Sequence, residues 1–284
     1  STDETSDILR HIKEKHQNVH LEFMPYDRPG KRAALQIGID AAQGPIILLT
    51  DADCKPQSPQ WISQMVAPMH KGSDLVLGAA PFAVSNGLLN AFSRWENFVT
   101  LQLFTAEAVR QSPFMALGRN MALSKKVSSL SMEESDGDLI GGDDDLFVNR
   151  IGKTHTTSIV LNSAAHMVSP AKKTLRDFYH QKKRHVSTSS RYQLADQIFL
   201  FVFASSTWIQ LLGLMAITVL GFWKLALCLY LFRLLGIALR INLLASDQPA
   251  FRFGWKLPLL DFAYLLYYPF LTLFMLQKPP TKWK

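Results

Sequence analysis

The hydropathy of the chain changes abruptly near residue 191, and this change limits the possible folds more than any other feature. Up to Arg191 the sequence mixes charged and apolar residues, as a soluble domain does, whereas long apolar runs dominate from Gln197 onward. The 48% share of hydrophobic residues is therefore an average over two regions that suit different solvents. We expect a soluble domain over residues 1–191 and a membrane domain over residues 192–284.

Three apolar segments make up the second region, at residues 197–220, 222–245 and 256–276. The first contains no charged residue and is long enough to cross roughly 30 Å of hydrocarbon, so we expect transmembrane helices here. Arg233 in the second segment and Asp261 in the third are costly in lipid unless they face protein. We expect the two to pair with each other, and contact with a lipid-linked substrate is the alternative.

A cluster of basic residues precedes the first apolar segment in this chain of net charge +7. Positive charge beside a membrane segment marks its cytoplasmic side and attracts anionic lipid headgroups. We therefore expect membrane lipids as partners, and no nucleic acid, because the sequence contains no recognisable nucleic-acid-binding fold. The basic residues are Lys172, Lys173, Arg176, Lys182, Lys183, Arg184 and Arg191.

The end of the chain conflicts with a simple arrangement of three spanning helices. If the first region is cytoplasmic, three spans place the basic residues 278–284 outside, which the positive-inside rule disfavours. Either one apolar segment is re-entrant or interfacial, or the rule does not hold for this chain.

The first region alternates between strand-like and helix-like patterns, which predicts an α/β sheet as its core. The wholly apolar run at residues 46–49 is typical of a buried parallel strand. The aromatic-rich helix expected at residues 88–109 either packs in the core or lies in the membrane interface. The remaining expected strands are 19–23, 74–78 and 155–161, and the remaining expected helices are 6–15, 33–42, 58–69, 143–151 and 174–185.

Asp51-Ala52-Asp53 follows directly on the apolar run that ends at Leu49. Ligands of open α/β sheets bind outside the carboxyl ends of the strands, and residues two apart in an extended segment point to the same side. Two carboxylates placed in this way can hold Mg²⁺ or Mn²⁺, and the ion can stabilise a diphosphate leaving group. The alternative is a solvated loop of acidic residues.

A second acidic cluster lies in the sequence Gly141-Gly142-Asp143-Asp144-Asp145. Like charges close together raise the pKa of at least one carboxyl group, which suits a general base. The alternative is capping of the following helix, since acidic residues favour the positive end of the helix dipole. Both can hold at once if one aspartate caps while another does chemistry.

Two basic stretches complete the set of candidate motifs. In Gln181-Lys182-Lys183-Arg184-His185, helical spacing places Gln181, Arg184 and His185 on one face. Arginine and lysine suit phosphate recognition, and the alternative is a basic patch beside the membrane. Gly30-Lys31-Arg32 is a small basic loop before a helix, where an anion is favourable.

In this order and spacing, the motifs resemble those of the family 2 glycosyltransferases, which are inverting enzymes with a GT-A (Rossmann-like) α/β fold. The resemblance runs over nearly the whole chain and includes the membrane helices that follow the catalytic domain in bacterial membrane-bound members. The matching stretches are Ser1-Thr2-Asp3, Gly30-Lys31, LLTDADC at 48–54, GRNMAL at 118–123, GGDDDLF at 141–147 and QKKRH at 181–185.

The resemblance implies a hexosyltransferase that uses a nucleotide-sugar donor, expected to be a UDP-sugar, and a lipid-linked or polysaccharide acceptor. Asp53, helped by Asp51, would hold the metal, Mg²⁺ or Mn²⁺. The base would come from the second acidic cluster, with Asp144 favoured and Asp143 next. The implied location is the bacterial inner membrane, with several spans and a cytoplasmic catalytic domain. The implied site residues are Asp143, Asp144 and Asp145 as catalytic candidates, and Lys31, Asp51, Asn120, Gln181 and Arg184 as substrate contacts.

Two departures from the family pattern bear on function. His185 stands where the family has tryptophan, which weakens the expectation of processive polymer synthesis. The first strand and first acidic pair of the family would lie before Ser1, so the resemblance implies an incomplete nucleotide pocket and reduced or absent activity for this chain. Two other functions fit the same residues: a metal-dependent phosphotransferase or nuclease, and a membrane scaffold or transport subunit without catalysis.

Overall fold

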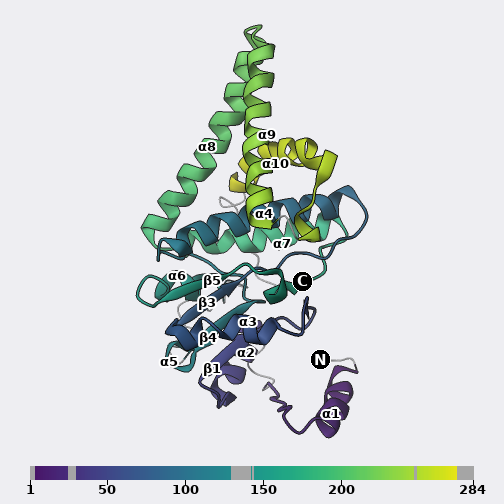
Figure 1. The fold of residues 1–284 in the computed structure, drawn as a ribbon, viewed down its shortest axis with the longest axis vertical. Helices are drawn as coiled ribbons and strands as arrows, with labels where there is room; N and C mark the ends of the chain where they lie inside the picture. The colour runs from purple at the N-terminus through teal and green to yellow at the C-terminus, as the bar shows by residue number, and fades with distance from the viewer. Residues whose placement is uncertain (1–3, 25–29, 129–141, 143, 246–247, 274–284) are drawn as a thin grey trace.

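The protein has an α/β body from which a long helical hairpin projects (Figure 1). The computed structural model describes residues 4–24, 30–128, 142, 144–245 and 248–273. The body ends and the hairpin begins close to residue 194, which agrees with the change in hydropathy near residue 191.

A four-stranded sheet forms the centre of the body, in the order β1-β4-β3-β5. β3 and β5 run parallel, whereas β4 is antiparallel to both β1 and β3. Leu75, Leu77 and Leu123 of these strands are almost completely buried, so the core lies against this sheet. The strands are β1 (Ile46–Leu49), β3 (Leu75–Gly78), β4 (Met121–Ser124) and β5 (Thr157–Val160).

The sheet differs from the expected one in three respects. The prediction of a parallel strand at residues 46–49 is wrong, because β1 pairs antiparallel with β4, with Ile47 opposite Leu123. β4 itself was not expected, since four residues carry too little periodicity to reveal a strand. Residues 19–23, expected as a strand, form no strand. An alternating pattern of five residues needs a neighbouring strand to supply hydrogen bonds, and no described strand lies beside it.

Short helices surround the sheet, mostly where helical patterns were expected, although the one at residues 125–128 was not expected. The helix predicted over residues 58–69 is shorter, because Pro68 cannot donate the backbone hydrogen bond that would continue it. These elements are α1 (Thr5–Lys15), α2 (Lys31–Ala41), α3 (Trp61–Val66), the 3-10 turn Met69–Lys71, α5 (Lys125–Ser128) and α6 (Asp145–Ile151).

A small second sheet lies beside the Asp51–Asp53 turn. It consists of β2 (Lys55–Pro56) paired antiparallel with β6 (Met167–Val168). A further bridge joins Phe82 to Ser169. These pairings bring a segment from late in the body next to the first acidic motif.

Two long helices lie between the sheet and the projecting hairpin (Figure 1). They are α4 (Leu88–Val109) and α7 (Leu175–Thr188), and a buried ion pair between Glu96 and Lys182 joins them. Trp95, Phe98 and Phe104 of α4 are almost completely buried, so these aromatic side chains pack in the core. These residues therefore pack in the core and do not lie in a membrane interface, which was the other role considered for this helix.

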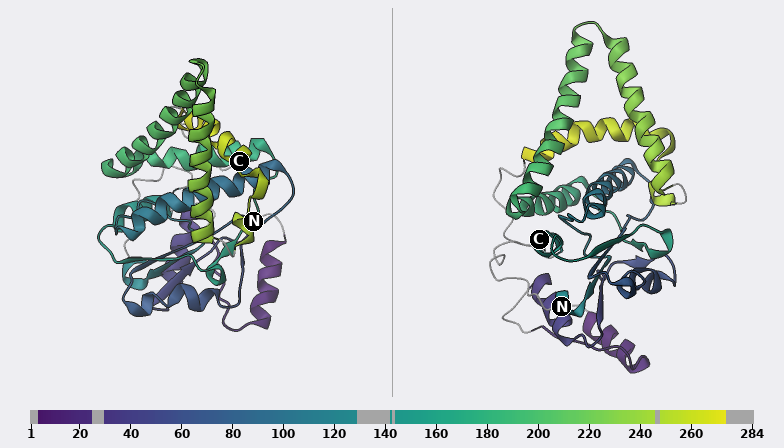
Figure 2. Two further views of the ribbon diagram at one scale, coloured as in Figure 1. Left: turned by 45° about the horizontal axis from the view of Figure 1, so that its top comes forward. Right: turned by 60° about the vertical axis from the view of Figure 1, so that its left-hand side comes forward.

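The hairpin consists of α8 (Leu194–Val219) and α9 (Trp223–Ala245), with the turn between them at its far end (Figure 2). Both helices are long and apolar enough to cross a membrane by length and composition. Only 17% and 6% of their most apolar stretches are buried inside the protein, so apolar side chains cover the outside of the hairpin. Soluble monomeric proteins rarely expose an apolar surface of this size to water unless it binds a membrane or another molecule.

The third apolar segment forms α10 (Leu257–Leu273), which crosses between α8 and α9 like the bar of a letter A (Figure 2, right). It packs against α8 and α9 and also against α4 and α7 of the body. Among the described residues, two helices are long and apolar enough to span a membrane, and the described 17 residues of α10 fall short of that length, so a third span stays a prediction. The part of the predicted segment after residue 273 lies outside the described residues.

Arg233 and Asp261 form the ion pair that the sequence led us to expect. Arg233 Nε lies 2.8 Å from Asp261 Oδ2 and Nη2 lies 2.8 Å from Oδ1, while Nη1 donates to Gln210 Oε1 at 2.7 Å. Asp261 is completely buried. The pair therefore ties α8, α9 and α10 together.

Candidate active site

A cleft of about 400 Å³ gathers the candidate motifs into one place. Its walls come from the turn after β1, the segment before β4, the start of α6 and one face of α7. The predicted site residues that line it are Lys31, Asp51, Asp53, Asp144, Asp145, Gln181 and Arg184. Segments from positions 31 to 185 therefore meet at a single site. Asp143 lies outside the described residues.

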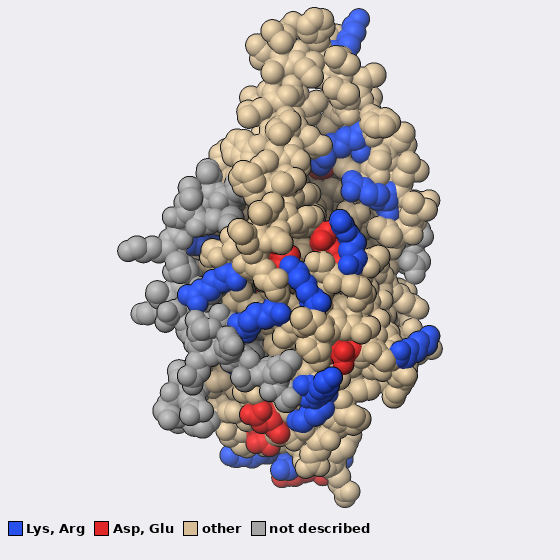
Figure 3. Space-filling view, turned by 90° about the vertical axis from the view of Figure 1, so that its left-hand side faces the viewer, with Lys and Arg blue, Asp and Glu red and all other residues tan. Residues whose placement is uncertain are grey.

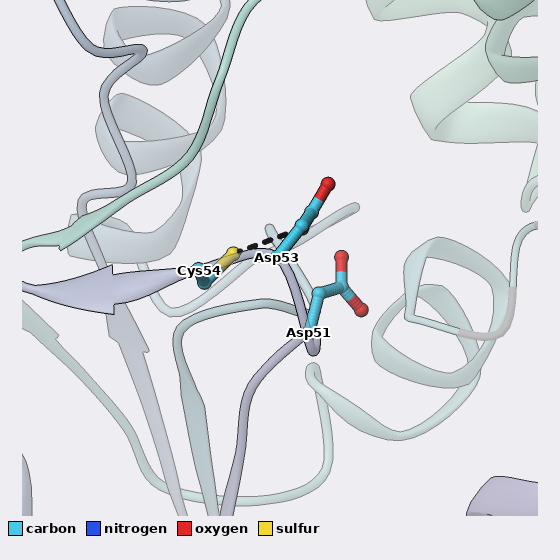
Figure 4. A group of neighbouring side chains, drawn as sticks. All are labelled: Asp51, Asp53 and Cys54. Carbon is cyan, nitrogen blue, oxygen red and sulfur yellow. Dashed lines mark hydrogen bonds between the residues drawn. The ribbon is translucent and has the colours of Figure 1, made fainter. Parts of the chain in front are cut away.

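Asp51 and Asp53 follow β1 in a tight turn that the backbone of Cys54 closes by donating to Asp51 O at 3.1 Å. The two carboxylates point away from the turn on the same side (Figure 4). One ligand atom from each of Asp51, Asp53 and Cys54 lies within 4.8 Å of the others. Lys31 Nζ, at the start of α2, lies 2.7 Å from Asp51 Oδ1.

The chemistry of this group fits a hard divalent cation. Burial, together with the nearby charges of Asp53 and Asp51, raises the pKa of Cys54 to about 11. The thiol is therefore protonated at neutral pH, and it points to Asp53 Oδ1 at 3.6 Å. Mg²⁺ and Mn²⁺ favour oxygen ligands over a thiol, so the carboxylate oxygens of Asp51 and Asp53 are the ligands that suit such an ion.

Asp144 is the acidic residue that faces the cleft from the second cluster. It precedes α6, and its side chain makes no capping bond to that helix. Oδ2 instead accepts a hydrogen bond of 2.6 Å from the backbone N–H of Gly118. A side chain at position 118 would not fit, because a Cβ atom there would lie 2.7 Å from Asp144 Oδ2. Gly118 thus lets the backbone approach the carboxylate closely enough to hold it.

Asp145 has a different environment from Asp144. It is buried in the first turn of α6. Burial, and then the nearby charge of Asp145, raise the pKa of Tyr192 well above its usual value. Asp145 therefore lies close to Tyr192 in the interior, whereas Asp144 is the more accessible of the two.

Arg119 is a site residue that we did not single out from the sequence. Its guanidinium lies over the ring of Phe82, 5.1 Å from the ring centroid, and Nη2 donates to Ala80 O at 2.7 Å. Burial lowers its pKa, while Asp51, Asp144 and Asp53 act in the opposite sense, so both acidic motifs lie near it. Among the described residues, its buried Nε has no hydrogen-bond partner. A single arginine in a loop has no periodic signal, and only its place in GRNMAL marks it.

Asn120 lies behind the cleft and does not line it. Its side chain is completely buried. The amide nitrogen donates to Ala79 O at 2.7 Å and to Ala165 O at 2.9 Å, and the amide oxygen accepts from Trp61 Nε1 at 2.9 Å. Both amide hydrogens are therefore used inside the protein. Asn120 supports the wall of the cleft, whereas we had expected it to contact substrate.

α7 presents different residues to its two sides. Gln181, Arg184 and His185 line the cleft, as their helical spacing predicts. Lys182 faces the other way and pairs with Glu96 of α4. The first residues of α7 lie close to α10, with the rings of Phe178 and Tyr267 5.9 Å apart. α7 therefore lines the cleft with one part and contacts α10 with another.

A mixed α/β fold with a D-x-D motif after a strand, facing a second acidic motif across one cleft, is typical of GT-A glycosyltransferases. Residues 1–127 match the family model described as glycosyl transferase family 2. Glycosyltransferase AglE of Haloferax volcanii is 31% identical over 104 residues, which are 36% of this chain and 33% of that protein. The match thus spans a third of the relative's length.

Solved structures with a similar course of the chain include glycosyltransferases. A mycobacterial protein of 15% sequence identity has a TM-score of 0.41, with coverage of 66% of this chain and 60% of that chain. Glucosyl-3-phosphoglycerate synthase from Mycobacterium tuberculosis, in complex with Mn²⁺ and UDP-glucose, has 17% identity and a TM-score of 0.38, with coverage of 66% and 63%. Likenesses of this size carry no conclusion about this chain.

Proposed function

We propose that the chain is the catalytic part of a membrane-bound, inverting glycosyltransferase. It moves a hexose from a nucleotide-sugar donor, expected to be a UDP-sugar, to a hydroxyl of a lipid-linked or polysaccharide acceptor. The observation that carries the proposal is the single cleft of about 400 Å³, where Asp51 and Asp53 share walls with Asp144 and with Gln181 and Arg184. The family match of residues 1–127 supports the same class of reaction.

The donor side of the proposed site is the turn after β1. Asp53 and Asp51 would hold Mg²⁺ or Mn²⁺, which when bound stabilises negative charge on a diphosphate. Lys31 and Arg184 contribute positive charge to the same cleft. Arg119 adds a third cation whose guanidinium is held in one orientation by Phe82 and Ala80. Donor phosphates would thus meet fixed and flexible cations together.

Asp144 is the proposed base on the acceptor side. The acceptor hydroxyl oxygen attacks the anomeric carbon and forms the new glycosidic bond, while the bond from that carbon to the diphosphate oxygen breaks. The hydroxyl proton passes to the Asp144 carboxylate. Gly118 N–H holds Oδ2 at 2.6 Å, so the other oxygen is the one to take the proton. A single displacement of this kind inverts the configuration of the anomeric carbon.

The proposed location is the bacterial inner membrane, with residues 1–191 on the cytoplasmic side. Support comes from the exposed apolar surface of α8 and α9. Lys and Arg side chains gather across the middle of the face shown in Figure 3, below the largely uncharged hairpin. Positive charge in this place suits the cytoplasmic surface of a bilayer. Because α7 both lines the cleft and contacts α10, an acceptor anchored in lipid would lie within reach.

The test is transfer of labelled sugar by membranes that contain the full-length protein, incubated with a panel of radiolabelled nucleotide sugars. Asp53→Asn and Asp144→Asn should each abolish transfer into lipid or polymer without unfolding the protein. Asp40→Asn is the matched control, because Asp40 is an exposed aspartate on α2 that does not line the cleft. Its transfer rate should equal that of the wild type.

The two other functions give different results in the same assay. A phosphotransferase or nuclease would release phosphate or cleaved nucleic acid and would leave the sugar label untransferred. A scaffold or transport subunit would keep its function in Asp53→Asn. Retained sugar transfer in both Asp53→Asn and Asp144→Asn would contradict the proposed mechanism.

A further inference from the structure

A buried polar joint connects α6 to the first turn of α8. Its centre is Asn149, which is 1% exposed. Asn149 Nδ2 donates to Asp196 Oδ2 at 2.7 Å, and its Oδ1 accepts from the backbone N–H of Gln193 at 2.7 Å. The carbonyl of Asn149 accepts from Gln193 Nε2, also at 2.7 Å. Three directional bonds thus hold one residue of α6 to two residues at the base of the hairpin.

Lys153 supplies the charge that this joint requires. Its Nζ lies 2.8 Å from both carboxylate oxygens of Asp196, which is 5% exposed. A buried carboxylate is costly unless it is paired and hydrogen-bonded, and here a cation and an amide meet both needs. Asp196 also lies in the first turn of α8, where the helix dipole favours negative charge. The joint is therefore complete within these residues.

The joint reaches the proposed base by two routes. The first is α6 itself, because Asp144 precedes the helix and lies five residues before Asn149, roughly 7 Å along the axis. The second is the segment before β4: Asn149 Nδ2 also lies 3.3 Å from Phe114 O, and four residues later Gly118 N–H holds Asp144 Oδ2. Both routes end on the same carboxylate.

Apolar contacts strengthen the second route. The ring of Phe114 lies 5.6 Å from the ring of Phe199 in α8 and 6.1 Å from the ring of Tyr192 just before it. Phe114 is 1% exposed. The segment that holds Asp144 through Gly118 is thus packed on the base of the hairpin as well as bonded to Asn149.

We propose that Asn149, Lys153 and Asp196 form a positioning unit that holds the Asp144 carboxylate through the base of α8. The hairpin then does more than anchor the protein, because the packing of the base of α8 on the body sets the position of the proposed base, Asp144. This inference rests on the proposed role of Asp144. A purely structural joint would affect stability alone, whereas a positioning unit affects the step in which the proton moves.

The test is a charge swap across the joint. Asn149→Asp places two carboxylates together and removes the donor to Asp196 and Phe114, so kcat should fall on the order of 10- to 100-fold, as small misplacements of a catalytic group do. The KM for the donor and the affinity for Mn²⁺ should stay within about twofold, because Asp51 and Asp53 are not part of the joint.

The double variant Asn149→Asp with Asp196→Asn should recover part of the lost kcat, because it rebuilds the bond between positions 149 and 196 but not the donor to Phe114 O. The new carboxylate at position 149 can accept from the new amide at position 196, and Lys153, whose Nζ lies 2.8 Å from the Asp196 oxygen that Asn149 contacts, is close enough to pair with it. Asp261→Asn is the control for general weakening of the membrane helices, because it disturbs the α9–α10 pair and not α6. This control should keep kcat within about twofold.

The melting temperature of every variant separates stability from positioning. Wild-type kcat in Asn149→Asp, or a double variant that regains the melting temperature with no gain in kcat over Asn149→Asp, would overturn the proposal. Failure of the underlying function looks different: wild-type membranes would transfer no sugar from any donor, or Asp144→Asn would transfer it at the wild-type rate.

Discussion

Arg119 is a cation of the cleft whose position several neighbours constrain. It lies over Phe82, donates to Ala80 O and keeps Nε without a partner among the described residues. Lysine cannot reproduce this arrangement, because it lacks a planar group with several fixed donors. Arg119→Lys should therefore lower kcat/KM for the donor about tenfold or more in steady-state transfer assays.

The control for this substitution is Arg110→Lys. Arg110 is an exposed arginine beyond the end of α4, and it pairs with Glu107 at 3.4 Å. Exposed pairs of this kind contribute little, so neither kcat/KM nor the melting temperature should change measurably. Equal behaviour of the two variants would show that Arg119 has no special part in donor binding.

Gly118 offers a second test at the scale of one residue. Gly118→Ala puts a Cβ atom 2.7 Å from Asp144 Oδ2, so the carboxylate must move and kcat should fall on the order of 100-fold. Gly38→Ala in α2 is the matched control, because no atom lies within 4 Å of its Cβ position. The control should keep kcat and gain about 0.5–1 kcal/mol in free energy of unfolding, measured by thermal or denaturant unfolding.

Residue types and spacing predicted the acidic members of the site, since Asp51, Asp53 and Asp144 all line the cleft. The same reasoning failed for Asn120, because the place of a residue in a motif does not reveal to which side of a strand its side chain points. It also passed over Arg119, whose contacts with Phe82 and Ala80 bring distant segments together at the cleft. The direction and the burial of a side chain depend on tertiary structure, which a short motif does not encode.

The Arg233–Asp261 pair controls how three helices fit together. Asp261→Ala leaves Arg233 without its buried partner, so the free energy of unfolding should fall by about 3–5 kcal/mol. Replacing both residues by leucine removes the unpaired charge and should recover most of that loss. Unfolding of the purified protein in detergent measures both. A single variant as stable as the wild type would show that the pair is not buried from solvent or lipid headgroups.

At the scale of elements, length decided what the sequence could predict. The helices α4, α8 and α9 have more than 20 residues each, so their apolar patterns repeat often enough to mark them. The four-residue strand β4 has no such repetition. The direction of β1 depends on that strand, so both were missed together. The orientation of α10 depends on the helices against which it packs, which composition alone does not reveal.

The whole molecule implies a simple topology in the membrane. α8 and α9 form one hairpin, while α10 packs back onto α4 and α7 of the body. If α8 and α9 both span the membrane, they return the chain to the side of the catalytic domain. Cysteine labelling in a background without Cys54 and Cys228 tests this arrangement. A cysteine at Gly221 should react from the periplasmic side, and a cysteine at Leu273 from the cytoplasmic side only. Periplasmic labelling at Leu273 would make α10 a third span.

This topology would also remove the conflict at the end of the chain. With two spans, the basic residues 278–284 are expected on the cytoplasmic side, in agreement with the positive-inside rule. Of the alternatives that the sequence left open, an interfacial third segment is the one that the packing of α10 favours.

The position of α7, which lines the cleft and contacts α10, has a kinetic consequence. For an acceptor dissolved in the bilayer, enzyme and acceptor meet by diffusion in a plane. The rate should then follow the mole fraction of acceptor among the lipids and not its amount per volume of suspension. Diluting the acceptor with inert phospholipid at constant bulk concentration should slow transfer, whereas diluting the whole suspension of vesicles should leave the turnover per enzyme unchanged.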